Sequence, residues 1–106
     1  MTGKDGLDEY LRQYHCGEEN AVSSRELERV FRLDGAKLRR TINALREKGV
    51  PICSFDGGYY YAATDEELRR TIWQFRSRIR RMAIAERGLS YALAGYANTG
   101  QFSLLL

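Results

Sequence analysis

Residues 35–48 combine basic and amide side chains that are able to bind nucleic acid. This stretch contains five basic residues and one acidic residue, which gives it a net charge of +4. Arginine donates a fork of hydrogen bonds to guanine O6 and N7, and asparagine pairs with adenine N6 and N7. Arg40 and Asn43 are three residues apart, a spacing that places both on one face of a helix. We therefore expect this stretch to contact a nucleic acid.

The apolar residues of the same stretch predict which face of the helix is buried. Leu38, Ile42 and Leu45 lie within about 60° of one another on a helical wheel and should face a core. The small residue Gly35 allows the helix N-terminus to approach a phosphate, which the helix dipole favours. The exposed side then presents the candidate binding residues Ala36, Lys37, Arg39, Arg40 and Asn43. The alternative interpretation is a solvated amphipathic helix whose arginines only maintain solubility.

Two further helices are expected before this stretch. Apolar residues at spacings of three and four predict a first helix over residues 6–16, with an apolar stripe of Leu7, Tyr10, Leu11 and Tyr14. Ser23 and Glu26 have the spacing of a capping box, in which each side chain bonds the backbone N–H of the other residue. This box predicts a second helix over residues 24–31. A short edge strand is expected just before it, at residues 21–22.

A β-hairpin is predicted directly after the third helix. Asp34 is a good N-cap for that helix, and Gly49 supplies its C-terminal stop. Residues 52–55 and 59–62 are rich in aromatic and branched residues and are expected to form the two strands. Asp-Gly and Gly-Gly tolerate positive φ, so residues 56–58 are expected to form the turn.

A long helix is expected after the hairpin, beginning at the capping box of Thr64 and Glu67. Gly88 can end it, and we expect the helix to continue to about Gly95, followed by a loose tail over residues 96–106. Apolar residues within it repeat at spacings of four and three, as in a coiled-coil heptad. The predicted dimerisation residues are Leu68, Ile72, Phe75, Ile79 and Met82.

The apolar seam of the long helix must be buried, either against the rest of the chain or against a second copy. Flanking arginines such as Arg69, Arg76 and Arg78 would repel one another in a parallel coil. An antiparallel pair, or packing with the acidic first helix, suits them better, and we favour a homodimer. The many arginines of this helix indicate either a second phosphate-contacting surface or a solvated face.

The order of the expected elements is typical of a winged helix-turn-helix. Residues 23–62, SSRELERVFRLDGAKLRRTINALREKGVPICSFDGGYYYA, resemble the winged helix-turn-helix domain of the biotin-repressor type. The matching features are S-x-x-L before the turn, I-x-x-L-R-x-x-G-V after it, and a closing Gly-Tyr strand. The stretch is also similar to small winged-helix proteins of bacteria and their phages. It covers about 40 of the 106 residues, and winged helices serve many partners.

The resemblance implies DNA binding through the third helix, with the hairpin wing touching the backbone or the minor groove. The wing tip, residues 56–58, carries no Lys or Arg, which argues against a phosphate contact there. An outward Tyr60 would still donate a hydrogen bond to a phosphate, while Tyr59 and Tyr61 are expected in the core. The positions that the resemblance implicates in DNA binding are Ser23, Ser24, Ala36, Lys37, Arg39, Arg40, Asn43 and Tyr60.

Composition excludes several other classes of protein. The chain has 106 residues, with 43% hydrophobic and 29% charged residues, which suits one small globular domain. No apolar run reaches the length of about 18 residues that a membrane span requires. Two cysteines and one histidine, without metal-ligand spacing, predict neither a disulfide framework nor a metal site. We find no catalytic triad or Walker pattern.

Charge is distributed unevenly along the chain. Residues 1–34 contain five basic and eight acidic residues, whereas residues 35–106 contain twelve basic and six acidic residues. The corresponding net charges, −3 and +6, sum to the net charge of +3 for the whole chain. A basic remainder after an acidic first third indicates a surface that faces a polyanion, or simply an uneven solvated surface.

These observations predict a mainly α fold with a small β-hairpin, a winged helix-turn-helix over residues 1–63 followed by a long C-terminal helix over residues 64–95. The expected function is sequence-specific binding of double-stranded DNA, as a cytoplasmic transcriptional regulator or a phage- or replication-associated protein. We expect no enzymatic activity, no cofactor, no small-molecule ligand and no membrane partner. The alternative is a winged-helix module for protein–protein interaction in a larger assembly.

Overall fold

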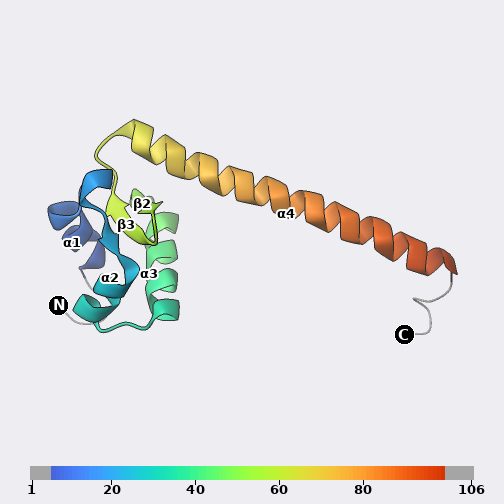
Figure 1. The fold of residues 1–106 in the computed structure, drawn as a ribbon, viewed down its shortest axis with the longest axis horizontal. Helices are drawn as coiled ribbons and strands as arrows, with labels where there is room; N and C mark the ends of the chain where they lie inside the picture. The colour runs from blue at the N-terminus through green and yellow to red at the C-terminus, as the bar shows by residue number, and fades with distance from the viewer. Residues whose placement is uncertain (1–5, 100–106) are drawn as a thin grey trace. The chain divides into compact units, whose positions relative to one another are not determined.

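The protein is mainly helical, with a small three-stranded antiparallel sheet and a long C-terminal helix, as the sequence predicts (Figure 1). The computed structural model describes residues 6–99. It contains two compact units, one ending at Thr71 and the other beginning at Ile72. The elements, in chain order, are α1 (Leu7–Tyr14), a 3-10 helix η1 (Glu18–Asn20), β1 (Val22–Ser23), α2 (Ser24–Phe31), α3 (Gly35–Glu47), β2 (Ile52–Phe55), β3 (Gly58–Tyr61) and α4 (Asp65–Thr99).

Helices α2 and α3 begin where the capping residues predict. The Ser23 hydroxyl accepts a hydrogen bond from the Glu26 backbone N–H at 3.1 Å, and the Asp34 carboxylate accepts one from Lys37 at 2.8 Å. Each cap satisfies one of the N–H groups that a helix start leaves without an internal partner. The return bond expected from Glu26 is wrong, because the Glu26 carboxylate pairs with Arg29 on the next turn of α2.

A glycine-dependent cap ends α3. The Val50 N–H bonds to the Leu45 carbonyl at 3.0 Å, and the Gly49 N–H bonds to the Arg46 carbonyl at 2.9 Å. This pair of bonds defines a Schellman motif, which requires a left-handed residue after the helix. Gly49 provides it at φ 91°, a conformation that disfavours any side chain. The motif turns the chain so that Val50 packs against the core.

A two-residue turn joins the strands of the hairpin. Asp56 and Gly57 both have positive φ, 49° and 78°, as a type I′ turn requires. Gly58 is already the first residue of β3, so the expected three-residue turn is one residue too long. Strand β3 lies in the middle of the sheet and pairs with β2 on one side and with β1 on the other. This places β1 at the sheet edge, as the sequence predicts.

The core lies between the three short helices and one face of the sheet. Tyr10 packs against it with its ring centroid 5.2 Å from that of Phe31, and Tyr59 and Tyr61 pack against it from β3. The expected burial of Tyr14 is wrong, because α1 ends at this residue and leaves its ring exposed. The buried core residues are Leu7, Leu11, Val22, Leu27, Phe31, Leu38, Ile42 and Ile52.

The opposite face of the sheet is also covered. Tyr60 is 2% exposed and Cys53 is fully buried, so the prediction of an outward Tyr60 is wrong. The start of α4 lies against this face, where the Cys53 thiol donates to the Glu67 carbonyl with an Sγ–O distance of 3.7 Å. Burial, with a further contribution from Cys53, raises the pKa of Tyr60 to about 12. Tyr60 is therefore a core residue and is removed from the candidate DNA contacts.

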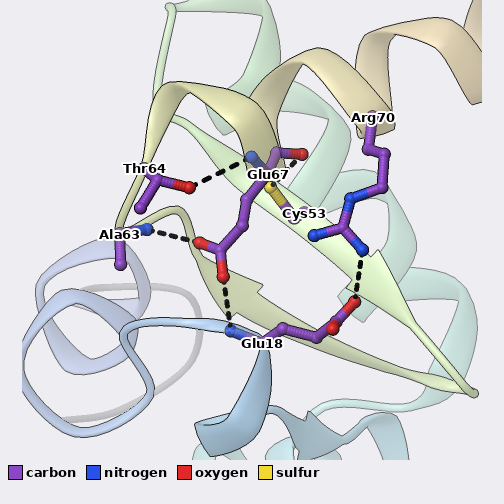
Figure 2. A network of polar contacts seen from close by, with 6 residues as sticks. All are labelled: Glu18, Cys53, Ala63, Thr64, Glu67 and Arg70. Carbon is purple, nitrogen blue, oxygen red and sulfur yellow. Dashed lines mark hydrogen bonds and ion pairs between the residues drawn. The ribbon is translucent and has the colours of Figure 1, made fainter.

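The Glu67 carboxylate connects the start of α4 to the residues around it (Figure 2). It accepts hydrogen bonds from the backbone N–H groups of Glu18 at 3.0 Å and Ala63 at 2.8 Å. The Glu67 N–H in turn donates to the Thr64 hydroxyl at 3.2 Å. Arg70 forms an ion pair with Glu18 at 3.1 Å. Thr64 thus caps α4 as predicted, while the Glu67 carboxylate bonds the N–H groups of Ala63 and Glu18 in place of that of Thr64 and ties the first turn of α4 to η1.

These hydrogen bonds to Glu67 make the folding stability of the protein depend on pH. The backbone N–H groups of Glu18 and Ala63 hold the pKa of Glu67 below its usual value of 4.5. A group with a lowered folded-state pKa contributes stability that is present above its unfolded pKa and lost as the pH falls through its folded pKa. We therefore expect the wild type to lose this contribution as the pH falls below 4.5.

A Glu67→Gln variant should remove that acid-dependent contribution. We expect it to be less stable by about 1 kcal/mol at neutral pH, because a neutral amide accepts the two N–H bonds more weakly. The loss of stability between about pH 6 and about pH 3 should be smaller than in the wild type. Urea unfolding at several pH values measures this, with the exposed neighbour variant Glu66→Gln as control. Identical pH profiles for wild type and Glu67→Gln would contradict the prediction.

Helix α4 is longer than the sequence predicts. It continues through Gly88 and Gly95 to Thr99, so neither glycine ends it and residues 96–99 are not part of a tail. A glycine costs about 1 kcal/mol relative to alanine in a helix interior, which is too little to end a helix of 35 residues. The remainder of the expected tail, residues 100–106, lies outside the described residues. No helix in the described part is long and apolar enough to span a membrane.

Candidate nucleic-acid interface

The face of α3 that the sequence predicts to be exposed is exposed. Leu38 and Ile42 are each only 1% exposed and anchor the helix to the core, while Leu45 is half-buried against it. Because these residues fix the rotation of α3, the opposite face of the helix points to solvent. The exposed candidate residues on α3 are Ala36, Lys37, Arg39, Arg40 and Asn43.

One carboxylate lies at the start of this face. The backbone N–H of Lys37 and the charges of Lys37 and Arg40 hold the pKa of Asp34 below its usual value. Asp34 is therefore ionised at neutral pH and partly offsets the positive field of the first turn. Lys37, Arg39 and Arg40 together outweigh this single charge, so the exposed start of α3 is positively charged.

The basic side chains of this face differ from Arg12 and Arg29 of the first unit. Arg12 pairs with Glu9, and Arg29 pairs with Glu26, each within its own helix. Within residues 6–99, no salt bridge involves Lys37, Arg39 or Arg40. Asp34 offsets only part of their charge, so these cations keep an attraction for an external anion. The first two turns of α3 therefore concentrate cations that can neutralise phosphates.

Arg46 is basic but belongs to the fold. Its Nε donates to the Ile52 carbonyl and its Nη2 donates to the Ser54 hydroxyl, both at 2.8 Å. Its guanidinium also lies 5.8 Å from the centre of the Tyr59 ring. These contacts tie the end of α3 to β2. Sequence reasoning counted this residue in the charge of the helix and missed its role, since no local pattern separates it from Arg39 or Arg40.

A groove runs beside the exposed face of α3. It has a volume of about 600 Å³ and is lined on one side by the start of α1 and on the other by one stripe of α3. Lys37 and Arg40 line its α3 side, and Lys48 extends the positive charge toward the helix end. Asp8 is the acidic residue in the lining. Sequence reasoning missed this groove, because it depends on how α1 packs beside α3.

The start of α2 lies next to the hairpin turn. Ser24 donates its backbone N–H to the Gly57 carbonyl at 3.1 Å, which fixes the turn against the helix. Ser23 is exposed and Ser24 is half-buried, and the exposed Arg25 follows them. The Ser23 hydroxyl accepts the capping bond and keeps its proton available for an external acceptor. Arg25 adds a cation here that the sequence analysis did not select.

The outer edge of the sheet is acidic. A shallow hollow of about 290 Å³ lies along β1 and the hairpin, lined by Glu18, Glu19 and Asp56 together with Phe55. Phe55 is 47% exposed. This arrangement repels phosphates and favours a protein surface. It agrees with the absence of Lys and Arg from residues 56–58.

Known proteins do not identify the chain. Comparison with protein-family models, with curated proteins and with solved structures finds no match. The resemblance of residues 23–62 to winged-helix domains therefore stays a prediction. Among the residues that the structure describes, no three His, Cys, Asp or Glu side chains are grouped as a metal site would require.

Proposed function

We propose that this chain is a winged helix-turn-helix protein that binds double-stranded DNA through α3. The observation that carries the proposal is the set of exposed cations at the start of α3, held outward by the buried Leu38 and Ile42. The element order also supports it, because two short helices joined by a tight turn precede a hairpin. In this arrangement the second helix of the pair enters the major groove.

The dimensions of α3 suit a major groove. Its 13 residues span about 20 Å at 1.5 Å per residue, and a groove about 12 Å wide admits one helix. The small Ala36 and Gly35 allow the helix start to come close to the duplex. Arg40 and Asn43, one turn apart, are then placed to contact base edges.

We assign the remaining cations to the phosphate backbone of the DNA. Lys37 and Arg39 flank the base-contacting positions and would neutralise phosphates on the two sides of the groove, which fixes register without reading sequence. Ser24 and Arg25 would anchor the start of α2 to a neighbouring phosphate, whereas Ser23 lines the acidic hollow and is not assigned a phosphate contact. The hairpin tip makes no phosphate contact in this proposal, because the adjacent hollow is acidic.

The biological role that suits such a protein is transcriptional regulation or a phage- or replication-associated function. Both roles need sequence-specific recognition of a duplex.

A protein–protein interaction module in a larger assembly is the second candidate. The acidic hollow with its exposed Phe55 favours it, since exposed aromatic residues are common at protein interfaces. On this alternative the basic face of α3 would be a solvated surface and DNA would not bind.

Fluorescence anisotropy with a labelled pool of duplexes tests the proposal. We expect the full chain to bind at about 50 mM salt and to weaken steeply by about 200 mM, because phosphate contacts release counterions. Arg40→Ala should weaken binding by about tenfold, since a base-contacting arginine contributes about 1–3 kcal/mol. The matched control is Arg12→Ala, which removes one positive charge from α1 and should change affinity little.

Two results would count against DNA binding by α3. If no duplex binds at low salt, the interaction-module candidate is favoured. If duplexes bind and Arg40→Ala and Arg12→Ala weaken them equally, the attraction comes from net charge alone and not from the face of α3.

A further inference from the structure

Apolar residues follow a heptad along nearly all of α4. Positions spaced by four and three residues continue beyond Met82 through Leu89, Leu93 and Tyr96. The only polar residue in this row is Glu86. We call this row the seam, and it comprises Leu68, Ile72, Phe75, Ile79, Met82, Glu86, Leu89, Leu93 and Tyr96.

The seam presents large apolar side chains at the surface of the chain. Ile79, Met82 and Leu89 are 63%, 71% and 73% exposed. Contiguous exposed apolar surface on this scale marks an interaction site. A helix with a heptad seam is stabilised in water chiefly by packing that seam against another helix. The remaining question is which helix packs there and in which direction.

Charge divides the seam into two unlike halves. In the first half Arg76 and Arg78 flank Phe75, and the Arg78 guanidinium lies 5.0 Å from the centre of the Phe75 ring. In the second half the flanking positions are small and uncharged, for example Ala83 and Ala85. Glu86 is the only acidic residue between positions 68 and 99. Glu86 accepts a hydrogen bond from the Ser90 hydroxyl at 2.8 Å, and burial of the seam in an assembly would require a cation near its carboxylate.

We infer that the seam binds a second copy of this chain in antiparallel orientation. Two parallel copies would place Glu86 against Glu86 within the seam, which is unfavourable. In the antiparallel orientation, each Glu86 reaches the arginine-rich half of the other copy. One register brings it to the layer of Phe75, between Arg76 and Arg78.

The same register pairs the apolar positions with one another. Ile72 of each copy meets Leu89 of the other, and Ile79 meets Met82, while Leu68 meets Leu93. The arginines that flank the first half then lie over Ala83 and Ala85 of the other copy, where no like charge opposes them. The small side chains leave room for the long arginine stems, which cover apolar surface while their charged ends reach water.

Sedimentation equilibrium of the full chain tests whether the dimer forms. We expect a mass of twice the 12.2 kDa of one chain. Ile79→Glu should give the mass of one chain, because it introduces a carboxylate at the centre of the seam. The control Tyr91→Glu adds the same charge at an 84% exposed position away from the seam and should stay dimeric. If the wild type sediments with the mass of a single chain, the seam does not bind a second copy and the inference is overturned.

Cysteine cross-linking tests the orientation, in a Cys16→Ser background. Ile72→Cys and Leu89→Cys chains should form a disulfide with each other when mixed under oxidation, and little when each is oxidised alone. A parallel pair would instead form disulfides when each variant is oxidised alone, and mixing the two variants would add none. That result would contradict the antiparallel arrangement.

Charge exchange tests the role of Glu86. Glu86→Arg should lower the dimer affinity by at least tenfold, because it places a cation between Arg76 and Arg78 of the other copy. Adding Arg78→Glu to the same chain should restore most of that affinity. If Glu86→Arg dimerises as well as the wild type, Glu86 does not meet those arginines and the proposed register is wrong.

Discussion

A Gly58→Ala variant should lose much of the stability of the first unit. A Cβ added at this position would lie 2.2 Å from the Val22 carbonyl oxygen and 2.8 Å from its carbon. Both atoms are backbone, so a side-chain rotation cannot relieve the clash. The strand pairing of β1 with β3 places Gly58 opposite Ser23, and glycine in a strand often marks such a close backbone approach. Only a glycine allows β1 to pair here.

The expected loss is about 3 kcal/mol, in the upper part of the range for single substitutions. For a unit of this size it lowers the Tm by more than about 10 °C. Circular dichroism on heating, together with urea unfolding, measures both. Gly88→Ala is the matched control, since a Cβ there meets no atom within 4 Å and alanine favours the helix by about 1 kcal/mol. Equal melting temperatures for wild type and Gly58→Ala would show that β1 does not approach β3 this closely.

A charge reversal on α3 should abolish DNA binding. Lys37 and Arg40 lie one turn apart on the same side of the groove beside α3, so Lys37→Glu/Arg40→Glu replaces two attractive charges with two repulsive ones. We expect affinity for duplex DNA to fall by about a hundredfold or more at about 50 mM salt. Any residual binding should show a salt slope that is smaller by about one unit, since Lys37 is the phosphate contact of this pair and each such contact contributes about 0.9.

The control for this variant has the same change in net charge at another surface. Arg12→Glu/Arg29→Glu reverses two arginines that lie in exposed ion pairs on α1 and α2. Such pairs contribute little to stability, so both variants should remain folded by circular dichroism. Comparable losses of affinity in the two variants would contradict a role for the α3 face.

Local signals in the sequence predicted the elements that carry the candidate site. The bounds of α2 and the start of α3 follow from Ser23 and Asp34, because a cap acts within one helical turn. The end of α3 at Gly49 follows in the same way from the need for positive φ. The exposed face of α3 was predicted because periodicity alone separates Leu38 and Ile42 from Arg40 and Asn43.

Features that depend on distant segments were missed. Tyr60 was expected to face outward because an alternating strand usually has one solvated face. The start of α4 covers that face instead, and nothing in the strand itself indicates this. The groove beside α3 and the contacts of Arg46 with β2 likewise depend on how separate elements pack. Gly88 is a possible helix stop by sequence, yet a lone glycine costs a helix of this length little and α4 continues through it.

The most direct test of the central claim is nuclear magnetic resonance of the labelled chain titrated with a short duplex. We predict that the largest shifts of backbone amide signals occur over residues 35–43, with smaller shifts at residues 23–25 near the start of α2. Signals from α1 and from residues 72–99 should move least. Shifts confined to residues 72–99, or an unchanged spectrum at saturating duplex, would contradict DNA recognition by α3.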